Sequence, residues 1–383
     1  MAKKRTERAY CFFYPIFNTY LRLKFRYRYE RFPKLAGPCL ILANHTMDLD
    51  PLLLAAAAGR DLRFVASEHI MRKGFGTWFL QRYFAPIVHT KGKMGLKTSM
   101  DILRAIRRGE SVALFPEGNR SFNGNTGEIP AVTGKLAKST GVPLLTYRFE
   151  GGYLTQPRWS VSTRKGMVRG RFVHLYMPEE LNSMTDEEIT ETIRRDLDEN
   201  AYRTNEKLRI AYRGKALARG IEAAVFSCPA CGAFGTLNSK GNKVFCLCGF
   251  SAKYNEYGVL EGSDGKLHTV AEWDALQKEQ LRAYMEQSAP DTPLFSDLLR
   301  CERIGRAHDV ADTASSTLVA RKDGAVFGGR FIPLKEIRGL AVHSRNTLTV
   351  HIGENETQYE LHGEESFSAL KYLYLYQMLQ GKK

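Results

Sequence analysis

Short apolar segments alternate with amphipathic ones between residues 38 and 180. Four segments are apolar at nearly every position, which is typical of strands buried on both faces: 38–43, 62–66, 111–115 and 142–149. Between them, apolar residues recur at helical spacing, and each predicted helix ends near a glycine: 51–58, 98–108 and 135–139. Because strands that alternate with helices are joined by crossovers, the pattern predicts a mainly parallel α/β sheet flanked by helices.

The pattern changes after residue 180. Thr185 and Glu188 have the spacing of a capping box and open a helix that we expect to run to about Leu208. Residues 213–220 mark a predicted domain boundary. A cysteine-rich module follows this boundary, and a further helix is predicted over 270–287.

From about Pro293 onward, short β-type segments are separated by turn signals such as Asp323-Gly324. The predicted strands are 317–320, 325–327, 330–333, 337–343, 347–352 and 357–362. An amphipathic helix over 366–379 follows the last strand. This order of elements, a mainly antiparallel β domain closed by one helix, resembles a pleckstrin-homology-like (PH-like) domain.

Residues 1–36 combine aromatic and basic side chains, with ten Lys and Arg against two Glu. Between Leu21 and Tyr29 apolar and basic residues alternate almost strictly, which favours a strand, although a continuous helix is the alternative. Aromatic rings beside Lys and Arg suit the interface of an anionic membrane. The other interpretation is an element that packs on the core and leaves a basic face in water.

Composition narrows the class of protein. The 383 residues suggest two or three domains, and the net charge of +15 suggests an anionic partner, either nucleic acid or a membrane surface. A second basic stretch, 158–171, is expected to be a solvated loop and edge strand or to line an anionic substrate or lipid surface. No run of about 18 apolar residues occurs, so no transmembrane helix is expected.

No signal peptide is expected either, because Asn18, Arg22 and Lys24 interrupt the first apolar stretch. We therefore expect a cytoplasmic protein, in which the seven cysteines do not form a disulfide framework.

Two loops that follow predicted strands carry reactive side chains. In the first, Asp50 stands five residues after His45, so its carboxylate can fold back onto one imidazole nitrogen and leave the other free as a general base. In the second, Gly118 allows a sharp turn and Arg120 offers a planar guanidinium suited to phosphate. Ligand sites of α/β sheets collect at the carboxyl ends of strands, so we expect the two loops to converge.

These loops resemble the motifs of glycerolipid acyltransferases, specifically 1-acylglycerol-3-phosphate (lysophosphatidate) acyltransferases. The family motif N-H-x4-D is matched by Asn44, His45 and Asp50, and F-P-E-G-x-R-S is matched over 115–121 with Asn119 at the variable position. A hydrophobic strand entered through Val142-Pro143 is similar to a further motif. In the remaining motif Lys91 stands where the family usually has Arg, which weakens the expected phosphate contact there.

The resemblance implies an O-acyltransferase of phospholipid biosynthesis. His45 would deprotonate the hydroxyl of a lysophospholipid acceptor, and Asp50 would orient the imidazole; Asp48 is the competing partner. The acyl donor would be acyl-CoA or acyl carrier protein. The acceptor phosphate would be held by Glu117, Gly118, Arg120 and Lys91. No redox cofactor is expected.

Four cysteines form two close pairs, which predicts a four-cysteine zinc ribbon: Cys228, Cys231, Cys246 and Cys248. An all-cysteine site has no open coordination position, so the Zn²⁺ would be structural. The second pair has the spacing C-x-C in place of C-x-x-C. Disulfides and free thiols are the alternatives.

The predicted organisation has five parts: a membrane-interface segment (1–34), an acyltransferase domain (35–220), the zinc ribbon (221–258), a helical linker (259–292) and the PH-like domain (293–383). We expect a peripheral enzyme on the cytoplasmic face of an anionic membrane. A non-catalytic lipid-binding scaffold and a nucleic-acid-binding zinc-ribbon protein are the alternatives. The basic residues are concentrated in the aromatic N-terminal segment and near the two loops, whereas the ribbon between Cys228 and Gly249 has only Lys240 and Lys243, which argues against nucleic acid.

Overall fold

The computed structural model describes residues 2–67, 85–89, 96–305, 310–354 and 357–381. The chain divides into two compact units: the first is Met1–Pro157 with Thr163–Arg213, and the second is Arg158–Ser162 with Gly214–Lys383. The finer division into five parts stays a prediction. In the described part of the chain, no helix is both long enough and apolar enough to cross a membrane.

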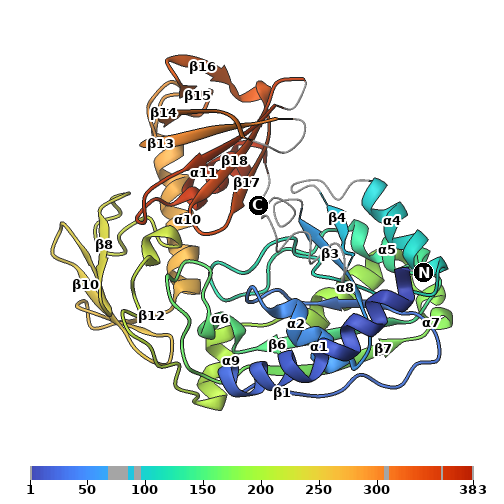
Figure 1. The fold of residues 1–383 in the computed structure, drawn as a ribbon. Coiled ribbons are helices and arrows are strands. Elements are labelled where there is room, and N and C mark those ends of the chain that lie inside the picture. The colour runs from blue at the N-terminus through green and yellow to red at the C-terminus, as the bar shows by residue number, and fades with distance from the viewer. Residues whose placement is uncertain (1, 68–84, 90–95, 306–309, 355–356, 382–383) are drawn as a thin grey trace. The chain divides into compact units, whose positions relative to one another are not determined.

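The first unit is built on a seven-stranded sheet with the order β1-β7-β6-β2-β5-β3-β4 (Figure 1). Its strands are β1 (Arg28–Tyr29), β2 (Leu40–Ala43), β3 (Arg63–Ser67), β4 (Ile87–His89), β5 (Val112–Leu114), β6 (Leu144–Glu150) and β7 (Arg169–Tyr176). Neighbouring strands run parallel except for β6 and β7, which are antiparallel. The mainly parallel α/β sheet predicted from the sequence is therefore confirmed.

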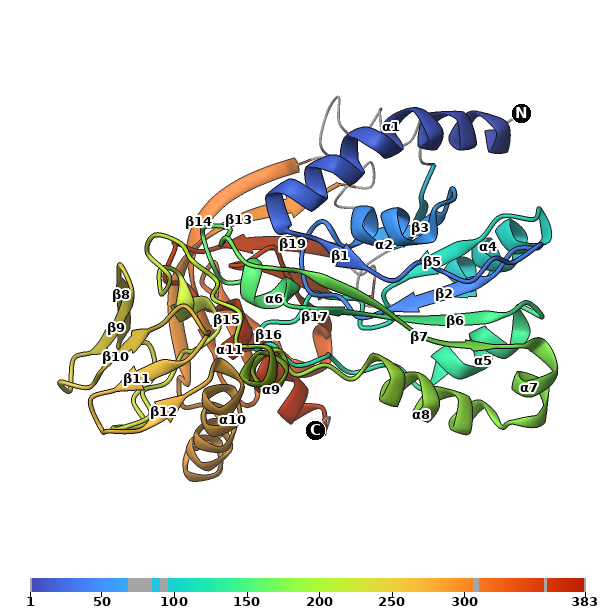
Figure 2. The ribbon, with the colours of Figure 1, turned by 90° about the horizontal axis from the view of Figure 1, so that it is seen from below.

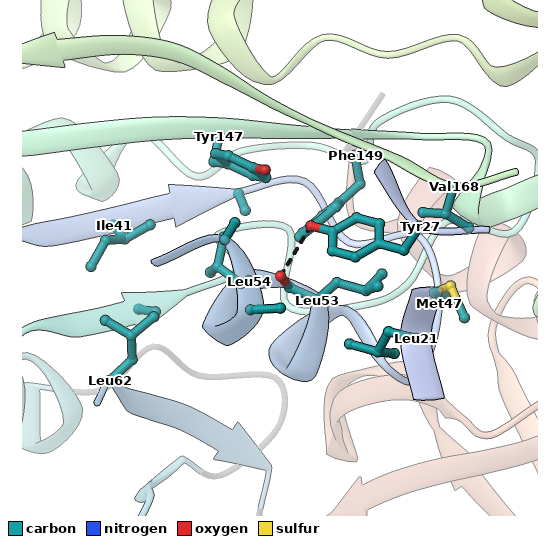
Figure 3. Close-up of a cluster of buried hydrophobic side chains, with 14 of the residues drawn as sticks. Leu21, Tyr27, Ile41, Met47, Leu53, Leu54, Leu62, Tyr147, Phe149 and Val168 are labelled. Carbon is teal, nitrogen blue, oxygen red and sulfur yellow. Dashed lines mark hydrogen bonds between the residues drawn. The ribbon is translucent and has the colours of Figure 1, made fainter. Parts of the chain in front are cut away.

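Helices flank this sheet and bury both of its faces. They are α1 (Ala2–Phe25), α2 (Asp50–Ala58), α4 (Leu96–Arg107), α5 (Val132–Ser139), α6 (Gly152–Thr155), α7 (Pro178–Ser183), α8 (Asp186–Leu197) and α9 (Ala201–Leu208). Alternate residues of β2 enter different cores: Ile41 packs with α1 and α2, whereas Leu40 packs with α4, α5 and α8. Figure 3 shows the first of these cores around Leu53 and Leu54. Burial on both faces explains why this strand is apolar throughout.

The strand predicted between Leu21 and Tyr29 is wrong for most of its length, because α1 continues to Phe25. Leu21 and Phe25 are one helical turn apart and both are buried, while Arg22 and Lys24 between them are exposed. The strand β1 comprises only Arg28 and Tyr29. The alternation in the sequence arose because buried Leu21 and Phe25 at the end of α1 are followed closely by buried Tyr27 and the strand β1.

The prediction of a single helix from Thr185 to about Leu208 is also wrong, because this segment forms two helices, α8 and α9. The capping box is confirmed, with the Thr185 hydroxyl accepting from the Glu188 amide. Asp198 is extended, however, and the side chain of Asn200 accepts from the amides of Tyr202 and Arg203 and so starts α9.

The second unit contains two antiparallel sheets. The smaller has the order β12-β11-β10-β9-β8, with β8 (Leu237–Lys240), β9 (Lys243–Cys246), β10 (Ser251–Tyr254), β11 (Leu260–Gly262) and β12 (Leu267–His268). A short 3-10 helix, η2 (Ile221–Ala223), precedes this sheet and the helix α10 (Val270–Gln287) follows it. A second capping box, between Thr269 and Glu272, starts α10.

The larger sheet has the order β16-β15-β14-β13-β19-β18-β17 (Figure 2). Its strands are β13 (Phe295–Ile304), β14 (Val310–Ala320), β15 (Gly324–Phe327), β16 (Arg330–Pro333), β17 (Ile337–His343), β18 (Thr347–Ile352) and β19 (Thr357–His362). The 3-10 helix η3 (Leu334–Glu336) joins β16 to β17, and α11 (Ala369–Leu379) follows β19. The predicted antiparallel domain with one closing helix is confirmed.

Candidate active site

His45 lies just beyond the carboxyl end of β2, and Asp50 is the first residue of α2, to which the loop 44–49 leads. The imidazole Nδ1 of His45 is 2.9 Å from Oδ2 of Asp50. Asp50 is fully buried, and its side chain points back toward the loop from the first turn of α2. The predicted pairing of the two side chains is therefore present, and it fixes the orientation of the imidazole ring.

Backbone and hydroxyl groups hold the Asp50 carboxylate in place. Its Oδ2 accepts the amides of Thr46 (2.5 Å) and Met47 (2.9 Å), and its Oδ1 accepts the Thr46 hydroxyl (3.1 Å). The loop 44–49 thus wraps around the carboxylate that orients His45. Asp48, the competing partner, makes no contact with the imidazole among the described interactions.

The His45 ring is open on one side. It stacks on Phe115, with ring centroids 4.4 Å apart and an angle of 22° between the planes. Its side chain is 21% exposed, and in the part of the chain that the structure describes Nε2 has no hydrogen-bond partner. The nitrogen that a general base needs is thus available to a substrate hydroxyl.

The loop after β5 reaches His45 through Glu117. Its carboxyl accepts the backbone N–H of His45 at Oε1 and that of Gly127 at Oε2, both at 2.6 Å. Burial raises the pKa of this carboxyl to about 8, and the two backbone donors act against that rise. Ser121 adds a second link, because its amide donates to the His45 carbonyl at 3.0 Å.

Arg120 lies on the same loop as Glu117. Its Nε is 3.1 Å from Oδ1 of Asp48, whose other oxygen accepts the Gln156 amide at 3.1 Å. Gly118 turns the chain between Glu117 and Arg120 with a φ of +66°, in the left-handed region that favours glycine. The two motif loops therefore meet through an ion pair as well as through Glu117.

The structure thus brings together five of the predicted site residues: His45, Asp50, Glu117, Gly118 and Arg120. The sixth, Lys91, lies outside the described residues. The sequence did not assign a role to Gln156 or Gly127, because both lie outside the motifs. Asn44 belongs to the motif, and its side chain bonds to both the amide and the carbonyl of Phe149 on β6 (2.7 and 2.9 Å).

A pocket of about 250 Å³, including the part open to solvent, lies next to His45 and is lined in part by Glu117, Asn125 and Glu199. Within the described residues, Oε1 of Glu199 and Oδ1 of Asn125 are buried without a hydrogen-bond partner. Burial raises the pKa of Glu199 to about 7. This acidic side chain comes from the segment before α9, and no sequence pattern indicated it.

Residues 24–150 match the model of the family described as Acyltransferase. These residues form an acyltransferase domain. The glycerolipid acyltransferase family predicted from the motifs is confirmed for this segment, which contains both the His45 loop and the Glu117 loop.

Named relatives are similar over about a third of the chain. A chloroplastic 1-acyl-sn-glycerol-3-phosphate acyltransferase of Brassica napus is 28% identical over 126 residues, which is 32% of this chain and 36% of that protein. A probable 1-acyl-sn-glycerol-3-phosphate acyltransferase of Mycoplasma genitalium is 31% identical over 121 residues, which is 30% of this chain and 44% of that protein. The chain thus spans less than half the length of these curated relatives.

Among solved structures, the chain is similar to the 1-acyl-sn-glycerophosphate acyltransferase PlsC of Thermotoga maritima. The match has a TM-score of 0.44 and 20% identity, and it covers 55% of this chain and 81% of that one.

The four predicted cysteine ligands lie outside the acyltransferase domain and close together in the second unit. The sulfur atoms of Cys228 and Cys248 are 3.7 Å apart and those of Cys231 and Cys246 are 3.8 Å apart. All four sulfurs lie within 4.8 Å of one another, and none is in a disulfide. A tetrahedral Zn²⁺ with Zn–S bonds of about 2.3 Å needs sulfurs about 3.8 Å apart, so this set fits the ion.

Proposed function

We propose that this protein is an O-acyltransferase that moves an acyl chain from acyl-CoA or acyl carrier protein to the free hydroxyl of lysophosphatidate. The observation that carries the proposal is the His45–Asp50 pair with Nε2 open, set inside a confirmed acyltransferase domain. The relatives named as a 1-acyl-sn-glycerol-3-phosphate acyltransferase and a probable one support the choice of acceptor.

His45 Nε2 takes the proton of the acceptor hydroxyl while the hydroxyl oxygen attacks the thioester carbonyl. The new C–O bond forms, the C–S bond breaks, and the imidazolium returns its proton to the leaving thiolate. Asp50 faces Nδ1 at 2.9 Å and stabilises the imidazolium between these two proton transfers. No covalent enzyme intermediate is required.

Arg120 lies on the loop that Glu117 connects to His45, and its guanidinium pairs with Asp48. We assign it to the acceptor phosphate together with Lys91 and the turn at Gly118. Glu117 has both carboxyl oxygens on backbone amides. We therefore give Glu117 a positioning role, holding the two loops in register, in place of the direct phosphate contact expected from the motif.

Helix α1 supports membrane attachment because it is apolar on two opposite sides. One side packs on the domain, with Leu21 and Phe25 buried and the Tyr10 hydroxyl bonded to the Ala55 carbonyl at 3.0 Å. The other side is exposed and carries Phe12 (68%), Ile16 (60%), Tyr20 (48%) and Leu23 (78%). Exposed Arg22 and Lys24 adjoin it. We propose that this stripe lies in the interface of an anionic membrane, on its cytoplasmic face.

We further propose that the four cysteines hold a structural Zn²⁺. The spacing of their sulfurs supports this assignment, and backbone amides of Ala230 and Cys231 point toward the sulfur of Cys228. The ion would stabilise the fold of the small sheet and take no part in acyl transfer.

The test is acyl transfer by the full chain to lysophosphatidate in anionic vesicles, with acyl-CoA and acyl carrier protein donors assayed in parallel. Wild type and His174→Ala, an exposed histidine of β7, are expected to form product, whereas His45→Ala is not. Absence of product from wild type with both donors would overturn the proposed activity. Vesicle binding without turnover would then indicate a lipid-binding scaffold.

A further inference from the structure

A second pocket lies in the second unit, between α11 and the larger sheet. Its floor is buried and is formed by Leu318, Leu348 and Leu375, and its rim is half-buried and includes Leu340 and Leu379. The pocket encloses about 430 Å³, including the part open to solvent, and is larger than the one beside His45.

Each polar side chain of the pocket wall already has a partner within the protein. Of the fourteen lining residues, only Arg321, Tyr372 and Tyr376 have polar side-chain atoms. The Tyr372 hydroxyl donates to Asp297 (2.5 Å), the Tyr376 hydroxyl donates to the Ile337 carbonyl (3.1 Å), and Arg321 pairs with Asp323 (2.5 Å). A peptide would leave its amides unpaired in such a pocket, whereas a hydrocarbon chain loses nothing there.

The chain segment that supplies part of the pocket lining is basic. Residues 321–338, which supply Arg321, Leu334 and Ile337 to the lining, contain five Lys and Arg against two acidic residues. Arg338 is exposed on β17 and lies in the chain between Ile337 and Leu340, which both line the pocket. A ligand with an apolar chain and an anionic end matches this distribution.

We propose that this pocket binds the hydrocarbon chain of a single-chain anionic lipid of the fatty-acid class, with its carboxylate at the basic rim. The site lies in the second unit, apart from the acyltransferase domain, and does not depend on the proposed acyl transfer. The antiparallel domain would thus bind a ligand independently of the acyltransferase domain.

The proposal is tested by titrating the full chain with oleate below its critical micelle concentration and measuring affinity and stoichiometry by calorimetry. Leu340→Glu places a carboxylate in the pocket, and Ala325→Phe fills it. Leu298→Glu is the matched control, because Leu298 is 72% exposed on β13 and does not line the pocket.

We expect both pocket variants to lose one bound oleate per chain or to weaken its binding at least tenfold, and the control to bind as wild type does. Arg338→Glu, an exposed position, should weaken binding severalfold and reduce its salt dependence. Unchanged binding in both pocket variants would assign any bound oleate to the acyltransferase domain, and it would overturn the proposal. Absence of binding to wild type would do the same.

Acyl transfer by these variants separates the two proposals. Pocket variants that lose oleate but retain turnover support a separate lipid site. A thermal unfolding curve for each variant shows whether a loss of binding comes from the pocket or from misfolding, and Ala325→Phe, which adds no charge, decides the question if Leu340→Glu does not fold.

Discussion

Glu117 and His45, 72 residues apart in the chain, are joined by a hydrogen bond of 2.6 Å from the backbone N–H of His45 to Oε1 of the glutamate. The other oxygen of Glu117 accepts from Gly127 at the same distance. One side chain therefore fixes the backbone of the proposed base and the loop that carries Arg120. The two hydrogen bonds explain why the motif has a glutamate at this position.

Replacing Glu117 by Gln should be nearly as harmful as replacing it by Ala. Glutamine has one oxygen and one NH₂ group, so either the His45 or the Gly127 amide would face a donor and lose its acceptor. The Gly127 amide is exposed and can bond to water, so the cost is largest, about 1–3 kcal/mol, when the half-buried His45 amide loses its acceptor. Urea unfolding should show a loss of this size for Glu117→Gln, together with lower kcat. Wild-type stability in this variant would contradict the positioning role.

Asp50→Asn tests the charge of the pair more cleanly. The amide oxygen can take the place of Oδ2 and accept from Thr46, Met47 and His45, while its NH₂ group faces the Thr46 hydroxyl, which can accept. The geometry is then retained and the negative charge is lost. We expect kcat to fall about 10²–10⁴-fold, the range that general-base catalysis supplies, with little change in KM.

Steady-state kinetics with lysophosphatidate measure this effect, and urea unfolding shows whether the fold is intact. A variant that is as active as wild type would mean that Asp50 serves only to fold the loop.

The two loops were predictable because each follows a strand, and parallel strands present their carboxyl ends at one edge of a sheet. The sequence did not say that β2 and β5 are neighbours, nor that Glu117 would bond to a backbone amide. The basic stretch 158–171 was expected to be solvated or to rim a substrate, but Arg158 and Arg164 are buried. Arg158 bonds to the carbonyls of Val342 and Ser344, which are nearly 190 residues away.

Such long-range contacts leave no local periodicity, and that is why the sequence did not reveal them. The same holds for Glu199, which reaches the pocket beside His45 from the turn between α8 and α9. Asn200 is a residue type that favours the start of a helix, and it caps α9. The spacing of polar residues in α9 nevertheless continues that of α8, and this suggested one helix.

Glu199 should make the stability of the protein depend on pH. Its pKa of about 7 lies above the ordinary value of about 4.3 because the carboxyl is buried. Between these values the folded state holds a proton that the unfolded state has released, so this group's contribution to stability falls as pH rises from about 5 to 7. Glu117, with a pKa of about 8, acts in the same direction up to about pH 8.

The check is urea unfolding of wild type and Glu199→Gln from pH 5 to 8. The variant does not titrate, so its stability should fall less over this range, with a difference of roughly 1–3 kcal/mol at pH 8. Parallel pH profiles for the two proteins would show that the Glu199 carboxyl does not titrate between pH 5 and 8.

The exposed stripe of α1 should govern binding to vesicles. Phe12→Ser with Ile16→Ser removes two apolar side chains, each of which contributes about 1.5–3 kcal/mol when it is buried in lipid. Sedimentation with anionic vesicles should show at least tenfold weaker binding. The matched control is Leu247→Ser with Leu267→Ser, since these residues are 83% and 70% exposed in the second unit. Equal losses in both double variants would argue against a membrane role specific to α1.

Cys231→Ser should release the metal and unfold the small sheet of the second unit. A hydroxyl is a much weaker zinc ligand than a thiolate, and Cys231 supplies one corner of the sulfur cluster. Elemental analysis of the purified chain should give one zinc for wild type and less than half an equivalent for the variant. Cys11→Ser is the control, because Cys11 is also exposed but belongs to α1.

Because a structural zinc contributes directly to folding, the thermal transition of the Cys231→Ser variant should shift downward as the metal is lost. A metal-free wild type that melts at the same temperature as the variant would mean that the four sulfurs hold no structural ion.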